Sequence, residues 1–413
     1  MKGLFFINFM VITSCICVVS ALLWDYVVRT GHRWLLLLGV LLLSVLSAAG
    51  LYHYEDLFPG LIASGWDGLY DRKAMAGLVW LLTCLLAFPC LLVVAIARFF
   101  CRPRRRRRQR RQRQRRSSGV TRRSFLKGLA ALIPVAAFAA SGAGNLLGER
   151  DLDTTYHVLK YKNLPDYLDG YKIGQLSDLH MGLFFSPRRL QEALDAVAAQ
   201  GVNRLEITGD LIDELALLPK AKAILEANAC RFPDGIDFCY GNHEYYRSFD
   251  AITAMLKETP IRVLRNSAFQ ASRGCGQGLK GCNGRDGRSF YIAAADYSFA
   301  KGDEAFAKER EQYVRETLAK VPEDAFVVLL AHHSAFIDEG FAHHIPLTLC
   351  GHTHGAQFAP IAPLVNALGF KYLRGLFQKS ECKGYVNRGT GHWLPFRVLC
   401  SREASVFELR KQA

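Results

Sequence analysis

Apolar and polar positions divide this chain into two unlike parts. The first 100 residues are dominated by three apolar runs without a polar face, at 4–24, 34–51 and 77–100. Each run approaches the ~20 residues that an α-helix needs to cross a bilayer. We therefore predict a three-span transmembrane region over residues 1–101, followed by a further apolar segment at 128–148.

Beyond residue 150, short apolar runs alternate with segments of helical periodicity. The runs 171–177, 204–208, 236–240, 326–331 and 347–350 predict buried strands, and 186–200, 215–228, 250–258 and 305–320 predict helices. Ser186 suits a helix N-cap, Pro187 the first turn and Gly201 the C-terminal stop. The pattern predicts an α/β domain over residues 150–413, with its functional loops at the carboxyl ends of the strands.

The net charge of +15 is concentrated in one place, because residues 102–116 hold eleven arginines. We expect this run to lie in a cytoplasmic linker over 102–127, touching anionic lipid. It lacks interleaved aromatic residues, so we expect no nucleic-acid partner. A nucleic-acid phosphodiesterase would need a basic stripe near its site, and the arginines after residue 260 are scattered.

Residues 121–127 read Thr-Arg-Arg-Ser-Phe-Leu-Lys and precede the apolar segment 128–148. This order is typical of a twin-arginine export signal, which would make the export machinery a partner. An ordinary fourth transmembrane helix with basic flanks is the alternative. Either interpretation predicts a multi-pass protein of the bacterial inner (cytoplasmic) membrane with residues 150–413 on the periplasmic side.

Seven cysteines lie beyond residue 150, and an odd number forbids complete pairing within one chain. Cys275 and Cys282, in a glycine-rich loop, would suit a local disulfide in an oxidising compartment. A pair of free loop thiols is the alternative.

Metal-binding side chains follow five of the apolar, strand-like runs. Asp178 and His180 are two positions apart, so both side chains share one face of an extended run. The carboxylate of Asp210 has two oxygens and can bridge two ions. Amide and imidazole ligands complete the set: Asn242, His332, His352 and His354. Joint occurrence in this order favours a metal centre over isolated structural roles.

The series Asp-x-His, Gly-Asp, Gly-Asn-His-Glu, His and Gly-His-Thr-His-Gly resembles the calcineurin-like metallophosphoesterase family over about residues 170–412. The stretch from Gly384 to Gly391 resembles its bacterial YkuE/YaeI-like branch, in which the metal loop often reads Gly-Gly-Gln where this chain has Gly355-Ala356-Gln357. The resemblance implies a two-sheet αββα sandwich after an all-α transmembrane region.

The same resemblance implies two divalent cations. One would be held by Asp178, His180, Asp210 and His354, and the other by Asp210, Asn242, His332 and His352. His243 would contact the phosphoryl group and protonate the leaving group as the catalytic acid. We prefer His332 over His333 as the ligand, and Asp213 as a supporting group. Arg388 is a candidate substrate clamp, with a structural salt bridge as the equal alternative.

Imidazole, carboxylate and amide ligands suit Mn²⁺ best, with Zn²⁺ or Fe as alternatives. We expect a phosphodiesterase or phosphatase that uses metal-activated water on a phosphoester, lipid-linked or otherwise, at the bilayer. Phe184–Phe185, Leu376–Phe377 and Trp393–Leu394 are candidates for lipid contact. A pyrophosphatase of the UDP-diacylglucosamine type is one alternative, and a non-catalytic metal-binding sensor or scaffold is another.

Overall fold

The computed structural model of the protein describes residues 2–28, 32–47, 72–100, 122–146, 152–182, 185–271, 288–367, 369–392 and 396–412. The arginine-rich run 102–116, the Cys275–Cys282 pair, Phe184 and Trp393–Leu394 lie outside these residues. The chain divides into a helical unit before residue 147 and an α/β unit after it.

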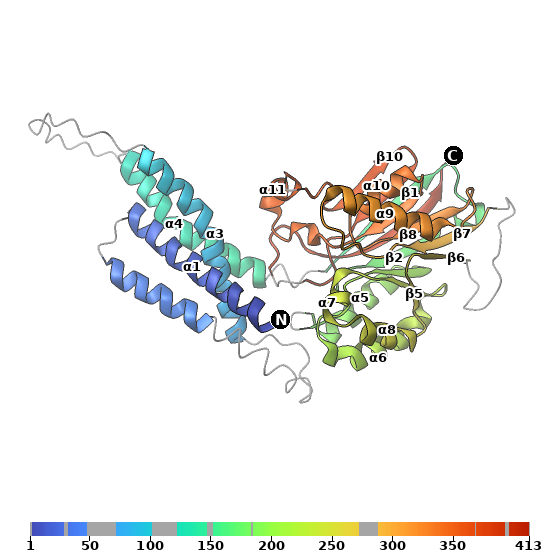
Figure 1. The fold of residues 1–413 in the computed structure, drawn as a ribbon, viewed down its shortest axis with the longest axis horizontal. Helices are drawn as coiled ribbons and strands as arrows, with labels where there is room; N and C mark the ends of the chain where they lie inside the picture. Colours follow the sequence, from blue (N-terminus) through green and yellow to red (C-terminus); the bar gives the residue numbers. More distant parts are fainter. Residues whose placement is uncertain are drawn as a thin grey trace, which may run out of the picture. The chain divides into compact units, whose positions relative to one another are not determined.

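The helical unit contains α1 (Lys2–Val28), α3 (Arg72–Phe100) and α4 (Arg122–Leu146), with α3 packed against both others (Figure 1). Each holds a window long and apolar enough to cross a membrane: Val11–Val28, Val79–Phe100 and Lys127–Gly144. The predicted span 34–51 is described only as the shorter apolar helix Arg33–Ser47, about 22 Å long at ~1.5 Å per residue. That is less than the ~30 Å hydrocarbon core, so two of the three predicted early spans have helices of spanning length among the described residues.

The α/β unit is built on two six-stranded sheets. The first has the order β1 (Leu152–Tyr161), β12 (Arg402–Lys411), β2 (Lys172–Leu176), β3 (Arg204–Thr208), β4 (Ile236–Cys239), β5 (Arg262–Leu264). The second has the order β10 (Gly375–Lys379), β11 (Cys382–Val386), β9 (Leu347–Cys350), β8 (Phe326–Leu330), β7 (Phe290–Ala294), β6 (Ser267–Ala271). The runs β2-β3-β4-β5 and β11-β9-β8-β7 are parallel, so their carboxyl ends gather at one edge of each sheet.

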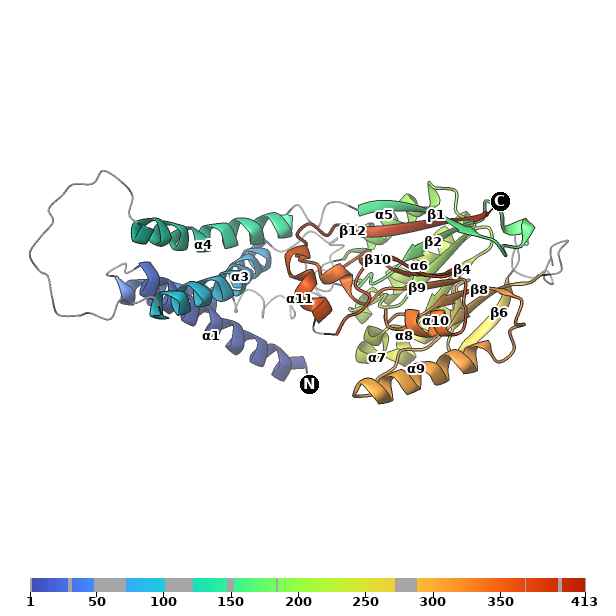
Figure 2. The same cartoon turned by 90° about the horizontal axis from the view of Figure 1, so that it is seen from above.

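The two sheets face each other across one apolar core, which joins residues such as Ile173 and Leu264 of the first sheet to Phe290, Val328 and Leu349 of the second. Helices α5 (Pro187–Ala198), α6 (Leu218–Asn228) and α8 (Phe249–Lys257) pack on the first sheet's side, and α9 (Asp303–Leu318) and α10 (Phe336–Ala342) on the second's (Figure 2). This is the expected αββα sandwich, preceded by an all-α region.

The α5 segment shows how local sequence sets this packing. The Ser186 hydroxyl accepts a hydrogen bond from the Arg189 N–H, and Pro187 opens the helix as predicted. Its buried face meets β2 at Gly174, where an added Cβ would lie 2.4 Å from a methyl of Val197. Glycine is therefore needed for the helix to approach the sheet so closely.

Candidate metal centre

The predicted ligands lie on loops that follow the strands of both sheets. Asp178 and Asp210 come two residues after β2 and β3, and Asn242 begins α7 (Asn242–Arg247) after β4. His332 and His352 come two residues after β8 and β9. Because these parallel strands end at the same edge, the topology gathers residues up to 176 positions apart, from Asp178 to His354.

Backbone strain is concentrated on these loops. Five of the seven proposed ligands have left-handed φ values, +52° at Asp178, +49° at His180, +54° at Asp210, +73° at His352 and +49° at His354. Side chains that are not glycine rarely adopt this conformation, at a cost of ~1–3 kcal/mol each. Such clustering indicates a site that the fold holds in place for function.

Glycines allow the strained loops to approach one another. A Cβ on Gly241 would lie 2.2 Å from Oδ1 of Asp210, and one on Gly351 would lie 2.2 Å from Oδ2 of Asp178. Gly209, at φ +82°, packs against the backbone of Gly241. No side chain fits at these contacts without moving a proposed ligand.

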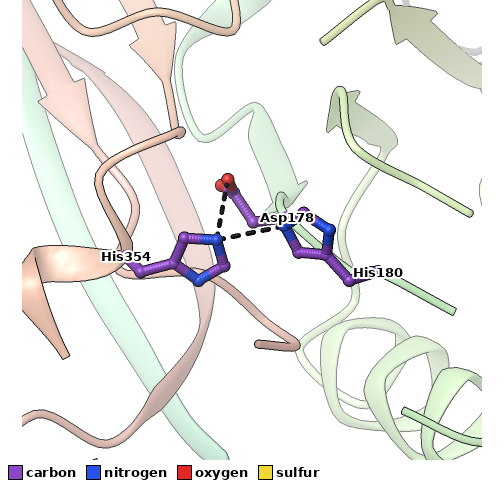
Figure 3. Close-up of side chains that lie close together, drawn as sticks. All are labelled: Asp178, His180 and His354. Atoms are coloured by element: carbon purple, nitrogen blue, oxygen red, sulfur yellow. Dashed lines mark hydrogen bonds and ion pairs between the residues drawn. The ribbon is translucent and has the colours of Figure 1, made fainter. Parts of the chain in front are cut away.

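The first group of ligand atoms comprises Asp178, His180 and His354 (Figure 3). Nε2 of His354 lies 3.1 Å from Nε2 of His180 and 3.5 Å from Oδ1 of Asp178. Figure 3 shows the two imidazoles approaching the carboxylate from opposite sides, one from each half of the sandwich. All three side chains are buried.

The second group comprises Asp210, His332 and His352, and a third joins His180, Asp210 and His243. Nε2 of His332 lies 3.1 Å from Oδ2 of Asp210, while Nε2 of His180 lies 3.5 Å from the same oxygen. Nδ1 of His352 lies 3.2 Å from Nε2 of His332. The Asp210 carboxylate therefore stands between the two sets of imidazoles.

The donor set fits a divalent cation. Within the described chain, the Oδ1 atom of Asn242 is buried without a hydrogen-bond partner, and an orphaned buried carbonyl is costly unless a cation takes its lone pairs. Nδ1 of His332 lies 2.7 Å from the Thr208 carbonyl, which fixes the proton there and leaves Nε2 as a lone-pair donor. Neutral oxygen, carboxylate and imidazole donors together suit a borderline metal.

Residues 171–356 match the family model described as calcineurin-like phosphoesterase. These residues form a domain of the calcineurin-like phosphoesterase family. The chain is 27% identical over 302 residues to the uncharacterized metallophosphoesterase YkuE of Bacillus subtilis, an alignment that covers 70% of this chain and 98% of that one. It is 30% identical to an uncharacterized metallophosphoesterase of Helicobacter pylori, covering 60% of this chain and 64% of that one.

Membrane segments also occur by name among the relatives. The chain is 27% identical to a transmembrane protein with metallophosphoesterase domain from Danio rerio, over 79% of this chain and 74% of that one. Among solved structures, a dimetal phosphatase from Danio rerio aligns with a TM-score of 0.30 and 11% identity, over 54% of this chain and 88% of that one.

The calcineurin-like domain holds its site residues in a strongly charged, buried environment. Burial disfavours the charged imidazoles, yet Asp213, Asp210 and Asp178 outweigh it and raise the pKa of His180 to about 9. Asp210 and Asp178 likewise overcome burial and raise the pKa of His332 to about 10. These groups bind protons where a cation would bind, which is the behaviour expected of metal ligands.

The other two proposed imidazole ligands, His352 and His354, have pKa values shifted in the opposite direction. Burial first, and then neighbouring cationic groups, lower the pKa of His352 and of His354 well below the ordinary value. Both rings are therefore neutral and keep a lone pair at neutral pH. Burial raises the pKa of Asp178, with Asp210 adding to the effect.

His243 contacts both Asp213 and the proposed ligand Asp210. Its Nδ1 lies 2.6 Å from Oδ1 of Asp213, and its backbone N–H donates to Oδ1 of Asp210 at 2.8 Å. Asp213 also lies 3.3 Å from Nδ1 of His180 and 3.3 Å from Nε of Arg247. The carboxylate thus orients two imidazoles from behind, which agrees with its predicted supporting role.

Glu244 has no role predicted from the sequence, although it is the last residue of the Gly-Asn-His-Glu motif. Its buried carboxylate accepts three backbone N–H groups, from Gly241 at 2.7 Å, Asp210 at 3.0 Å and Leu211 at 2.7 Å. It therefore ties the Asp210 loop to the Asn242 loop. A glutamate three residues into a loop–helix junction is the signal that could have revealed it.

A second group without a predicted role is the buried Arg397. It donates to the carbonyl oxygens of Arg388 and Gly391, both at 2.8 Å, and its NH2 lies 3.5 Å from Nδ1 of His354. Gly389, at φ +86°, packs beneath the same imidazole. Nothing in the local sequence distinguishes this arginine from a surface one.

Arg388 lies in structural contacts in this fold. Its guanidinium bonds to Glu403 at 3.2 Å, Ser401 at 3.3 Å and Asp153 at 3.3 Å. These contacts correspond to the salt bridge that was the alternative to a phosphate clamp, and the clamp itself stays a prediction.

His333 packs against His352 and accepts from the Ala335 N–H at 3.1 Å, outside the three ligand groups.

The sequence predicts that three histidines without a proposed role, His343, His344 and His392, lie at the surface or rim. His344 is exposed, and His343 is partly exposed with Nε2 at 2.9 Å from Glu311. The expectation is wrong for His392, which is 1% exposed. It lies on the loop after β11, next to Gly391, where an added Cβ would meet the Leu179 carbonyl oxygen at 1.9 Å.

Proposed function

We propose that this protein hydrolyses phosphoesters with two divalent cations, preferably Mn²⁺, at the surface of a membrane. The family supports phosphoester hydrolysis, and the position of Asp210 carries the two-cation proposal. Its Oδ2 faces Nε2 of His180 on one side and Nε2 of His332 on the other. A carboxylate in that position is suited to bridge two cations.

One cation would be held by Asp178, His180, Asp210 and His354, and the other by Asp210, Asn242, His332 and His352. When bound, such cations polarise phosphoryl oxygens and lower the pKa of a coordinated water. The protein holds the ligands rigid. Ser177 donates to Asp178 at 2.6 Å, and the His352 N–H donates to the same carboxylate at 2.9 Å.

His243 would supply a proton to the leaving oxygen. With Nδ1 facing Asp213, Nε2 would be available to donate to the leaving oxygen, with the ring held in place by the carboxylate. The pair therefore has the geometry of a positioned general acid. No group is required to form a covalent intermediate.

The proposal is tested by assaying the full chain in nanodiscs with bis-p-nitrophenyl phosphate and added Mn²⁺. We expect turnover that is lost on chelation, restored by Mn²⁺, and reduced at least 100-fold by Asp210→Asn. The matched control is Asp195→Asn on the exposed face of α5, which should leave turnover unchanged. Full activity of a folded Asp210→Asn variant, or indifference to chelators, would contradict the proposal.

We place the calcineurin-like domain on the periplasmic side of a bacterial inner membrane. Three helices of spanning length and the Danio rerio relative support membrane attachment. The assignment of the domain to the periplasmic side depends on the basic run 102–116, which should stay in the cytoplasm. Protease added to intact spheroplasts should cleave within residues 150–413, and cleavage only after lysis would refute this topology.

A further inference from the structure

An uncharged segment leaves the metal loop directly. Residues 355–370 contain no Asp, Glu, Lys, Arg or His, and they include the short helices η5 (Ala359–Ile361) and α11 (Ala362–Ala367). Pro360, Pro363 and Ala367 are exposed, and Leu364 is 58% exposed. A water-facing helix normally carries charged residues on its outer side, and this one carries none.

A second segment, residues 396–399, lies beside it, and its one charged residue, Arg397, is only 1% exposed, so that its exposed part is apolar. Val398 and Phe358 form an isolated parallel bridge, with the Ala359 N–H donating to the Val398 carbonyl at 3.0 Å. The rings of Phe358 and Phe396 lie 5.7 Å apart. We call residues 358–367 and 396–399 together the apolar rim.

Leu399 makes the rim unusual in a second, independent way. This leucine is 83% exposed, the highest value among the exposed large hydrophobic residues described, and its φ is +53°. Left-handed backbone is unfavourable for a bulky side chain, and in most proteins burial or a functional contact compensates for this conformational cost. Leu399 gains little burial from the described residues of the α/β unit, which indicates a partner outside that unit.

We propose that the apolar rim inserts into the surface of the lipid bilayer next to which the domain is anchored. The inference rests on the proposed membrane placement. Only residues 147–151 separate the end of α4 from the start of β1, and so short a chain extends at most about 20 Å. The bilayer is therefore within reach of the domain at all times, and apolar side chains of this kind sit at the boundary of headgroups and acyl chains.

The rim is continuous with the metal loop. The thiol of Cys400, which follows the second segment, lies 3.5 Å from the carbonyl oxygens of His354 and of Gly355. Docking the rim thus brings the proposed ligand His354 to the membrane interface. The substrate class that follows is a phosphoester borne by a membrane lipid, whose headgroup would reach the metals without leaving the bilayer.

The test places the photoreactive amino acid p-benzoylphenylalanine at Leu364 or Leu399 in the full chain, expressed in native membranes. The control position is Glu323, which is exposed on the loop before β8, at the opposite end of the strand from His332. After irradiation, adducts are identified by mass spectrometry. Each variant must hydrolyse bis-p-nitrophenyl phosphate within twofold of the unmodified chain, which shows that the domain is folded.

We expect lipid adducts at Leu364 and Leu399 at least tenfold above those at Glu323. Adducts to another polypeptide or to a second copy of the chain in place of lipid would overturn the inference, as would equal labelling at Glu323 or no lipid adduct at any position. Absence of bis-p-nitrophenyl phosphate turnover in the unmodified chain would instead refute the proposed function. Failure of the proposed function is therefore distinguishable from failure of the proposed lipid contact.

Discussion

Nδ1 of His243 lies 2.6 Å from Oδ1 of Asp213, and the other carboxylate oxygen lies 3.3 Å from Nδ1 of His180. One carboxylate thus orients both the proposed general acid and a proposed metal ligand. Burial disfavours the charged form, but the contacts with His180 and His243 outweigh it and hold the pKa of Asp213 well below its usual range. Asp213 is therefore ionised wherever the protein is folded near neutral pH.

Replacing Asp213 by asparagine tests the leaving-group chemistry when the variant and the unmodified chain are compared at equal metal content. An amide cannot stabilise the imidazolium of His243, so we expect turnover of an alkyl phosphodiester to fall about 10- to 100-fold. Turnover of bis-p-nitrophenyl phosphate should fall by a smaller factor, because p-nitrophenolate departs without a proton. The measurement is kcat on both substrates at equal metal content, and identical losses on the two would argue against the proton-donor role.

Glu244 offers a test of how the Asp210 loop is held. In a Glu244→Gln variant an amide N–H would face one of the three backbone N–H groups that the carboxylate now accepts. We expect the free energy of unfolding of the α/β domain to fall by roughly 2 kcal/mol, with weaker metal retention on dialysis. Glu226→Gln, on a partly exposed α6 side chain, should change stability by less than ~0.5 kcal/mol. Equal stability of both variants would contradict this role.

Metal binding should release protons. His180 and His332, with pKa values raised to about 9 and about 10, carry protons in the metal-free site at pH 7. A cation needs their lone pairs, so apparent affinity should rise with pH until these pKa values are passed, by up to 10-fold per unit for each proton. Calorimetry in two buffers of different ionisation enthalpy should show release of close to two protons. Binding that is independent of pH between 7 and 8 would refute the assignment.

The sequence predicted those parts of the fold that local patterns determine. Strands β3 and β9 have the predicted limits, 204–208 and 347–350, because each is a short run with alternating apolar residues that ends at a glycine-containing loop. Strands β1 and β12 were not predicted. Their parallel pairing joins residues 250 positions apart, as Leu152 with Arg402, and half of the β1 positions face outward. Such pairing has no local signature.

The metal centre likewise has parts that a local sequence pattern predicts and parts that it does not. The ligand residues were recognisable because metal chemistry restricts which residue types can serve. Their supports were not, because Thr208 and Arg397 act through a backbone carbonyl and a guanidinium that reach the site only after folding. The strain at Asp178 and Asp210 was equally invisible, since φ is set by the surrounding loops and not by the residue itself.

Ala356 occupies a position that suits glycine better. Its φ is +64°, and it follows Gly355 in the metal loop at φ +60°. The related branch often has glycine here, which avoids the clash of Cβ with the backbone in left-handed geometry. Ala356→Gly removes that strain, although glycine gains entropy in the unfolded chain. The strain is the larger effect, so we expect the free energy of unfolding to rise by roughly 0.5 kcal/mol.

The matched control is Ala251→Gly within α8, where the helix interior requires negative φ and glycine should cost about 1 kcal/mol. The two substitutions delete the same methyl group and should therefore shift the urea midpoint of the α/β domain in opposite directions. Destabilisation by both would show that the Ala356 methyl makes contacts that outweigh its backbone strain. Because the methyl lies next to Gly355 and His354, the glycine variant should also lower KM for bulky phosphodiesters if that methyl narrows access to the metals.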